Sequence, residues 1–252
     1  SFMEWGGIGE KTFVGLDNYI QMFHDKVFYT AFLNNLIYLV IVVAMQLGIG
    51  LLFAVMLTYM TKHVTLIKTL YYVPCIVTTV AIGQLFRSMY STEPMGLINQ
   101  FLQAIGLENL VTSWLANVST ALAAVSIPEG WRFTGMYMVI FYAALVSLDP
   151  SVYEAAKVDG ATEFQIFFRI KLPLIKDIIL LTLTMCLTGA LRGFDIPYLL
   201  TNGGPGTSTY LTGLTLYKTA FSSLKMGYSC TMAVFIFILS IIISVVQLKL
   251  TS

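Results

Sequence analysis

The chain has 252 residues, of which 57% are hydrophobic and only 11% are charged, and its formal net charge is +1. Soluble domains contain about 45–50% apolar and about 25% charged residues, so this is the composition of a membrane protein. The balanced charge argues against a nucleic-acid-binding face or a disordered acidic tail. Cys75, Cys186 and Cys230 lie far apart in apolar surroundings, which indicates small hydrophobic residues and neither a metal site nor a disulfide framework.

Residues 1–30 form a leading segment that we expect to lie outside the membrane. It opens with SFMEWGG, which has neither a starting Met nor a charged-then-apolar leader, so we expect no signal peptide and a natural beginning upstream of Ser1. The run GGIGEKT resembles a nucleotide-binding loop, but Glu10 stands before Lys11 where such a loop needs Gly. We therefore interpret this run as an ordinary polar loop.

Five apolar stretches are long enough to cross a bilayer, which takes about 20 helical residues. The second is interrupted by Pro74, which neighbouring helices can accommodate inside a membrane. The sequence therefore predicts an all-α integral membrane protein, a polytopic helix bundle in which residues 31–252 form one transmembrane domain. The predicted spans cover residues 31–59, 66–89, 119–148, 175–199 and 228–250.

The distribution of Lys and Arg orients these spans. Both residue types are densest in the short segments after the first and third spans and at Lys249, so we place these segments in the cytoplasm. The extracytoplasmic segments are then residues 1–30, 90–118 and 200–227. Apolar residues at helical spacing within 95–115 predict a helix at the membrane interface. The run LTNGGPGTST, which contains Gly203, Gly204 and Pro205, predicts a turn-rich loop.

Residues 149–174 form a charged, helix-forming segment between two apolar spans. Asp149 and Pro150 predict a helix start, with Ser151 and Glu154 as an alternative capping box. The pair Asp159-Gly160 predicts its end near Val158, because Gly tolerates the left-handed geometry of a helix terminus. A second helix should follow and stop at Pro173, with an apolar side made of Phe164, Phe167, Phe168 and Ile170.

Two interpretations of this helical hairpin are open. It could lie on the bilayer as an amphipathic anchor, or it could be a docking element for another protein. Ala155 and Ala156 allow close approach of a partner, and Glu154 and Asp159 offer directional polar contacts. Helix order alone does not decide between the two.

The string EAAKVDGATEFQIFFRIKLP resembles the EAA loop of permease subunits in bacterial ATP-binding-cassette importers. The matching positions are Glu154, Ala155, Ala156, Asp159, Gly160, Ala161, Ile170, Leu172 and Pro173. The resemblance covers nearly the whole chain, through FVGLDNY, GLINQFL, the Trp131-Arg132 pair, FDIPYLLTNGGPG and MGYSCTMAV. Within the sugar-importer branch these motifs look most like the maltose- and glycerol-phosphate-type subunit that carries the Gly-Gly-Pro loop.

The resemblance implies a type I importer permease fold and transport by alternating access. It implies a bacterial cytoplasmic membrane protein that forms, with a second homologous permease, the pathway for a mono- or oligosaccharide. The further partners implied are a dimer of cytosolic ATPase subunits, which carry ATP and Mg, and an extracytoplasmic solute-binding protein facing Gly203, Gly204 and Pro205. This chain would then be no enzyme and bind no cofactor of its own. The first of the family's usual six spans is missing, so we expect it to precede Ser1.

The resemblance also assigns a role to the hairpin, whose helices in this family are coupling helices seated in the ATPase subunit. We expect Glu154 and Asp159 to make the polar contacts of that seat, and Ala155, Ala156 and Gly160 to allow close packing there. Pro173 belongs to the same motif.

Charged residues inside spans are costly and mark either a pathway or an ion pair. Glu129 and Arg132 lie three residues apart, so they could pair along one helix. Alternatively, both face the cargo together with Trp131, which would stack on a sugar ring. Arg192 and Asp195 repeat the spacing, and there the structural pair is favoured. Glu129 departs from the family pattern, which leaves the solute open: a polyol or a glycerol phosphate ester is the alternative cargo.

Three single polar residues, Asn35, Gln46 and Gln84, are expected to make interhelical hydrogen bonds. An ion-coupled secondary carrier is a competing function, but it usually has inverted repeats and unpaired intramembrane carboxylates. An intramembrane enzyme would need a catalytic constellation that the spans lack. A bare scaffold would need no coupling loop.

Overall fold

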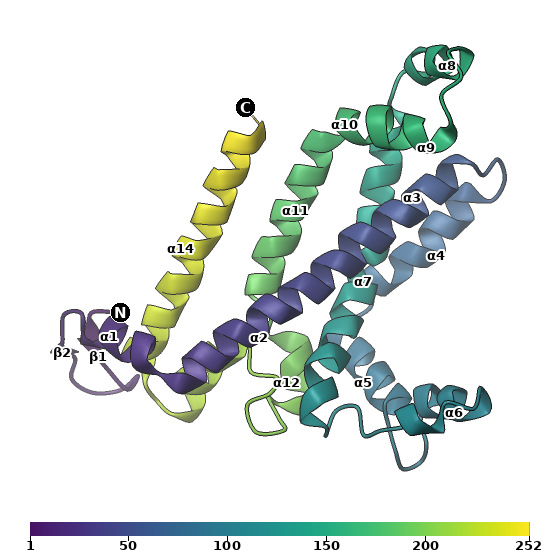
Figure 1. The fold of residues 1–252 in the computed structure, drawn as a ribbon. Helices are drawn as coiled ribbons and strands as arrows, with labels where there is room; N and C mark the ends of the chain where they lie inside the picture. Colours follow the sequence, from purple (N-terminus) through teal and green to yellow (C-terminus); the bar gives the residue numbers. More distant parts are fainter. Residues whose placement is uncertain (252) are drawn as a thin grey trace.

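The structure is a computed structural model that describes residues 1–251. Within these residues the regular secondary structure is helical apart from a short antiparallel strand pair near the N-terminus, β1 (Met3–Glu4) with β2 (Thr12–Phe13) (Figure 1). The helices of the first half are α1 (Asp17–His24), α2 (Lys26–Val43), η1 (Ala44–Ile49), α3 (Gly50–Thr58), α4 (Val64–Ile76), α5 (Thr79–Met89), α6 (Leu97–Ala104) and η2 (Glu108–Leu110). Those of the second half are α7 (Val118–Val146), α8 (Pro150–Val158), α9 (Glu163–Ile166), η3 (Phe167–Lys171), α10 (Leu172–Leu174), α11 (Lys176–Leu191), α12 (Asp195–Thr201), α13 (Thr212–Tyr217), η4 (Lys218–Ser222) and α14 (Met226–Thr251).

Two helices of the described chain are long and apolar enough to cross a membrane by themselves, Lys26–Thr58 and Met226–Gln247. Three further helix pairs pass the same test but bend at a short break, by 97°, 69° and 69°. Counting each bent pair as one crossing gives up to five crossings. The bent pairs are Val64–Ile76 with Thr79–Met89, Val118–Val146 with Pro150–Val158, and Glu163–Leu174 with Lys176–Leu191.

The first span is one long helix with a widened middle. Asp25 caps its start, accepting hydrogen bonds from the amides of Val27 at 2.8 Å and Phe28 at 3.4 Å. Its central turns, η1, have π-helical hydrogen bonding. A π-turn inserts an extra residue and shifts the faces of the helix after it.

Helix α7 is the centre of the bundle, because α2, α3, α4 and η1 all pack against it. Small residues allow this close packing. A Cβ atom at Gly135 would overlap the main-chain oxygen of Tyr71 in α4, and one at Gly50 would lie 3.3 Å from the main-chain oxygen of Thr134. Close approach at small residues is typical of membrane helices, where van der Waals contact replaces the hydrophobic effect between helices.

The second predicted span breaks later than Pro74 indicates. Helix α4 continues through Pro74 to Ile76, because a proline in the last turn removes only one hydrogen bond. The chain then extends at Val77 and Thr78, and the Thr78 hydroxyl caps α5 by accepting from Ala81 N. The predicted fourth span, 175–199, is likewise divided, because α11 ends at Leu191 and α12 starts at Asp195.

The loops gather at two ends of the bundle (Figure 1). Helices α8, α9 and α10 lie at one end, together with the α3–α4 connection and the end of α14. The N-terminal strands, α1, α6 and α12 lie at the other. The segments that we assigned to one side of the membrane thus occupy one end of the molecule.

Interhelical hydrogen bonds confirm the expectation for two of the three single polar residues. Asn35 donates to the main-chain oxygen of Ala190 at 3.2 Å and accepts from both the amide and the hydroxyl of Thr212. Gln46 donates to the main-chain oxygen of Glu129. The prediction was wrong for Gln84, whose side chain is exposed and makes no hydrogen bond within residues 1–251.

Candidate functional site

The first helix of the hairpin, α8, begins and ends where the sequence predicts. Asp149 caps it by accepting from the Ser151 amide at 2.9 Å, and Pro150 is its first residue. This hydrogen bond to the Ser151 backbone, helped by the Ser151 side chain, lowers the pKa of Asp149. The alternative box between Ser151 and Glu154 is not formed. The helix ends at Val158, and Gly160 follows with φ of +81°.

The motif residues of α8 are open to a partner. Glu154, Ala155, Asp159 and Gly160 are exposed, and Ala156 is half-buried. The helix itself buries no residue, and it projects from its end of the bundle (Figure 1). Val158 at its tip is 88% exposed.

The second helix of the hairpin differs from the prediction in which residues it buries. Ile166 is completely buried, whereas Phe164 is 71% exposed and its ring instead packs on that of Phe168, with 4.4 Å between centroids. The π-turn η3 follows immediately and rotates the later residues relative to an ideal helix. The helix ends at Leu174, one residue after Pro173, and the 69° bend into α11 follows, so the predicted end of the second helix is confirmed to within one residue.

Polar contacts join the two hairpin helices to the end of the first span. Lys157 Nζ lies 2.6 Å from Glu163 Oε1, and the Tyr59 hydroxyl donates to Glu163 Oε2 at 3.1 Å. The ion pair lowers the pKa of Glu163 and raises that of Lys157. The Lys171 ammonium lies 4.6 Å from the Tyr153 ring centroid and 5.8 Å from that of Tyr59. Sequence reasoning missed Tyr59, because no motif marks it.

A cavity of about 250 Å³ lies beside Glu129, between the first span, α7 and α11. Glu129 is half-buried, and its carboxylate makes no hydrogen bond or ion pair within the described chain. Its main chain is held by Gln46, which in turn accepts from the Cys186 thiol at 3.0 Å. The residues around the cavity are Val42, Gln46, Glu129, Phe133, Met136, Tyr137, Met185, Cys186, Gly189 and Ala190. Gln46, which the sequence assigned to an interhelical hydrogen bond, and Cys186, which it assigned to apolar packing, are thus also wall residues of this cavity.

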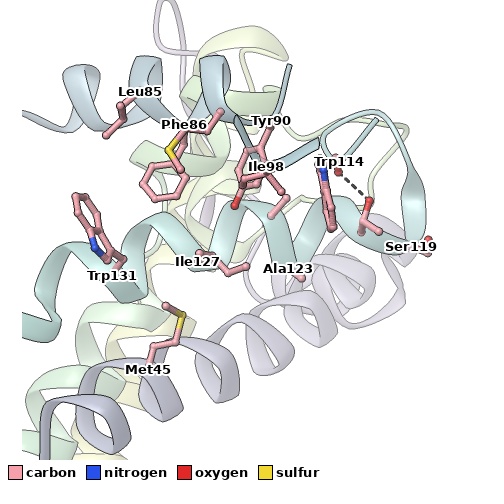
Figure 2. A pocket seen from close by; sticks show the side chains of 13 residues that line it. Met45, Leu85, Phe86, Tyr90, Ile98, Trp114, Ser119, Ala123, Ile127 and Trp131 are labelled. Carbon is pink, nitrogen blue, oxygen red and sulfur yellow. Dashed lines mark hydrogen bonds between the residues drawn. The ribbon is translucent and has the colours of Figure 1, made fainter. Parts of the chain in front are cut away.

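Trp131 faces a different cavity, of about 540 Å³ and apolar lining (Figure 2). Its ring lies 5.6 Å from that of Phe86 in α5, and Met45 approaches from the first span. Residues two apart on an α-helix point about 200° apart. The joint site that the sequence suggested for Trp131 and Glu129 is therefore not formed. The two-residue spacing of Glu129 and Trp131 already indicates that their side chains lie on different faces of the helix.

The predicted ion pairs along the helices are also absent within residues 1–251. Arg132 Nη1 donates to the Thr79 hydroxyl at 2.7 Å, at the start of α5, and makes no ion pair with Glu129. Arg192 and Asp195 are both exposed and unpaired in the same way. Arg132 therefore ties α7 to the break between α4 and α5.

The Gly-Gly-Pro loop is held in place from several directions. Gly203 is buried, its φ is +90°, and a Cβ atom there would overlap the Tyr210 ring, so only glycine fits. The Thr209 hydroxyl donates to the main-chain oxygen of Gly204 at 3.0 Å, and Lys218 Nζ donates to that of Asn202 at 2.6 Å. Gly204 and Pro205 are half-buried. The loop therefore presents a fixed backbone.

Comparison with known proteins gives a consistent set of similarities. The family described as binding-protein-dependent transport system inner membrane component matches residues 27–251. The probable ABC transporter permease protein YurN of Bacillus subtilis is 37% identical over 252 residues, 99% of this chain and 86% of its own. The lactose transport system permease protein LacF of Rhizobium radiobacter is 33% identical over 93% of this chain and 80% of its own. The fold is that of a chain in a bacterial ABC transporter involved in the import of the acidic polysaccharide alginate, with a TM-score of 0.83, 23% identity and coverage of 94% of this chain and 83% of that chain.

Proposed function

The chain belongs to the family of inner membrane components of binding-protein-dependent transport systems, and we propose that it takes up a sugar, a mono- or oligosaccharide, by alternating access. As a member of this family it is a permease subunit of an ABC importer with a type I importer permease fold. The lactose system to which LacF belongs supports a carbohydrate cargo. The polyol or glycerol phosphate ester remains the second candidate, because Glu129 departs from the sugar-importer pattern.

One observation carries the mechanism, the projecting hairpin. Helix α8 exposes Glu154, Asp159 and the apolar Val158 at the end of the bundle while burying nothing of its own. We propose that α8 seats in the ATPase subunit of the complex, with both carboxylates making polar contacts and Ala155 and Gly160 allowing close approach. A partner shifts a conformational equilibrium only through different affinities for the two states, so this seat must differ between them.

The proposed assembly contains four further components. Two cytosolic ATPase subunits bind ATP and Mg, and ATP hydrolysis is theirs. A second homologous permease completes the pathway in the bacterial cytoplasmic membrane. An extracytoplasmic solute-binding protein docks near the Gly-Gly-Pro loop, where Gly203 fixes the backbone and Gly204 and Pro205 are accessible in part.

The cavity beside Glu129 is the proposed place where this chain meets its cargo. A carboxylate is a strong acceptor for sugar hydroxyls, and Glu129 is not occupied by a cation in the described chain. Trp131 and Arg132 point elsewhere, so Glu129 and its neighbour Gln46 are the polar groups that this chain contributes there. Asp195 is exposed at the start of α12 and adds a second negative charge along the proposed path.

The test is solute-stimulated ATP hydrolysis by the reconstituted complex. We expect Glu154→Ala and Gly160→Pro to abolish the stimulation while the complex still assembles and the ATPase subunits keep their basal rate. Matched controls are Glu108→Ala, an exposed carboxylate in an extracytoplasmic loop, and Gly106→Pro. Gly106 has φ of +77° and free space around its Cα, as Gly160 has with +81°.

The outcomes separate the competing functions. Stimulation that survives both hairpin changes refutes the coupling role and leaves a hairpin anchored on lipid. A panel of sugars, polyols and glycerol phosphate esters in the same assay identifies the class of cargo. Uptake that continues without ATP and follows an ion gradient would instead indicate a secondary carrier.

A further inference from the structure

Glu163 joins three parts of the molecule at the base of the hairpin. It lies at the start of α9, and one of its carboxylate oxygens pairs with Lys157 of α8 at 2.6 Å. The other oxygen accepts from the hydroxyl of Tyr59, directly after α3, at 3.1 Å. One side chain therefore connects the projecting helix, the second hairpin helix and the cytoplasmic end of the first span.

A second contact reinforces this junction. Lys171, at the end of η3, places its ammonium 4.6 Å from the Tyr153 ring of α8 and 5.8 Å from the Tyr59 ring. Cation–π contacts of this kind orient a side chain without requiring burial. Tyr59 is thus held twice, through its hydroxyl by Glu163 and through its ring by Lys171.

Polar contacts matter here because α8 has no apolar attachment to the bundle. None of its residues is buried, and it packs against the short helix α9. A helix without a buried face is not fixed by packing, and its orientation follows from whatever specific contacts it makes. Of the contacts described above, the one that reaches α8 from a membrane span runs through Tyr59.

We propose that Tyr59 is a positioning residue that makes the hairpin and the first span move as one unit. The proposal rests on the coupling function of the hairpin. If the ATPase subunits displace α8, the contact from Tyr59 to Glu163 transfers that displacement to α3. Helix α3 continues through η1 into the wall of the cavity that holds Gln46. Movement at the ATPase seat would thereby reach the proposed cargo site along a single helix.

Pulsed electron paramagnetic resonance on the reconstituted complex tests this directly, with no need to know the solute. Spin labels at Val152 in α8 and Leu52 in α3, both exposed, report whether hairpin and span stay together. A second pair, Leu52 with the exposed Ile238 of α14, reports movement of the first span. Both pairs are introduced after replacing the three cysteines by serine, and both are measured without nucleotide and with ATP plus vanadate.

The decisive variant is Tyr59→Phe, which keeps the ring beside Lys171 and removes the hydroxyl. We expect the Val152–Leu52 distance distribution to become about twofold broader, and the nucleotide-driven change at Leu52–Ile238 to fall by about half. The control is Tyr142→Phe. The ring of Tyr142 also lies beside a lysine, with Lys68 Nζ 4.5 Å from the ring centroid, but the Tyr142 hydroxyl makes no hydrogen bond within the described chain.

Two outcomes overturn different statements. If Tyr59→Phe matches Tyr142→Phe at both label pairs while Glu154→Ala abolishes ATPase stimulation, the hairpin couples to the ATPase but Tyr59 does not position it. If Glu154→Ala leaves stimulation intact, the coupling function itself fails. If Tyr59→Phe keeps a narrow Val152–Leu52 distance distribution and an unchanged nucleotide-driven change at Leu52–Ile238, the positioning role of Tyr59 is refuted while the coupling function of the hairpin stands.

Discussion

Asn35 offers the sharpest test of how the first span is held against α11 and α13. It is completely buried, donates to the main-chain oxygen of Ala190 in α11, and accepts from the amide and the hydroxyl of Thr212 in α13. Replacing it with leucine removes three hydrogen bonds and leaves two buried donors and one acceptor with fewer partners. Each such bond is worth about 0.6 kcal/mol in a membrane protein and about 1 kcal/mol in general. The sum predicts that Asn35→Leu lowers the free energy of unfolding by about 2–3 kcal/mol.

The assay is reversible unfolding in mixed micelles titrated with dodecyl sulfate, followed by tryptophan fluorescence. Gln84→Leu is the matched control, because this amide also lies in a helix but is exposed and makes no side-chain hydrogen bond in the described chain. We expect the control to change the free energy of unfolding by less than about 0.5 kcal/mol. Equal effects of the two substitutions would refute the reasoning, since the loss would then follow from the chemistry of the substitution and not from the buried contacts.

Three further predictions concern the packing of α7 at the centre of the bundle, the cavity beside Glu129 and the hairpin. Gly135→Ala should lower the free energy of unfolding by about 1–3 kcal/mol, because the added Cβ would overlap the main chain of α4. Gly189→Ala is the control and should not lower it, because the space around Gly189 is free. Both variants are measured by the same micelle titration. Glu129→Leu should raise the solute concentration for half-maximal ATPase stimulation about tenfold or more, as expected for a lost hydrogen bond to a charged group, and an unchanged value would exclude Glu129 from the cargo site. The ion pair of Lys157 with Glu163 lowers the pKa of the carboxyl and raises that of the ammonium, so its stabilisation is present above about pH 4.3 and below about pH 10.4. This stabilisation is lost as pH falls through the depressed carboxyl pKa or rises through the raised ammonium pKa. The measurement is the amide exchange rate at residues 159–163 in Lys157→Met divided by the rate in wild type, and this ratio should approach one at both pH extremes. A ratio that stays constant with pH would contradict the prediction.

Local chemistry made much of the hairpin predictable. Asp149 and Pro150 mark the start of α8, and Gly160 marks its end, because capping and left-handed backbone are properties of single residues and their neighbours. The long apolar runs likewise predicted the membrane helices, since length and hydropathy need no tertiary context. The family fold was expected from the resemblance of the EAA string, and it is confirmed.

Features that depend on tertiary contacts or on helix phase could not be predicted in the same way. The sequence placed Phe164 on the apolar side of the second hairpin helix, but Phe164 is exposed and Ile166 is the buried residue. Both residues lie in α9, before the π-turn η3, so tertiary packing and not the π-turn decides which face of α9 is buried. Arg132 pairs with Thr79, 53 positions away in sequence, and not with Glu129 on its own helix. The break after α4 lies at Thr78, which caps the next helix, although Pro74 is the residue that the sequence marks as the interruption.

The distribution of buried surface explains why this chain is suited to work in a complex. Helix α7 packs on α4 at Gly135, where an added Cβ would overlap main chain, and on Gly50 of α3, where an added Cβ would be a tight contact, so these helices are expected to move together. The most apolar windows of the first and last spans are, by contrast, only 28% and 22% buried inside the chain. Their remaining apolar surface is left for lipid or for another membrane protein to cover. Because the first span packs against α7 through Gly50, a displacement at the end of this span would reach the cavity wall at Gln46 by movement of the packed helices together, without unpacking the core.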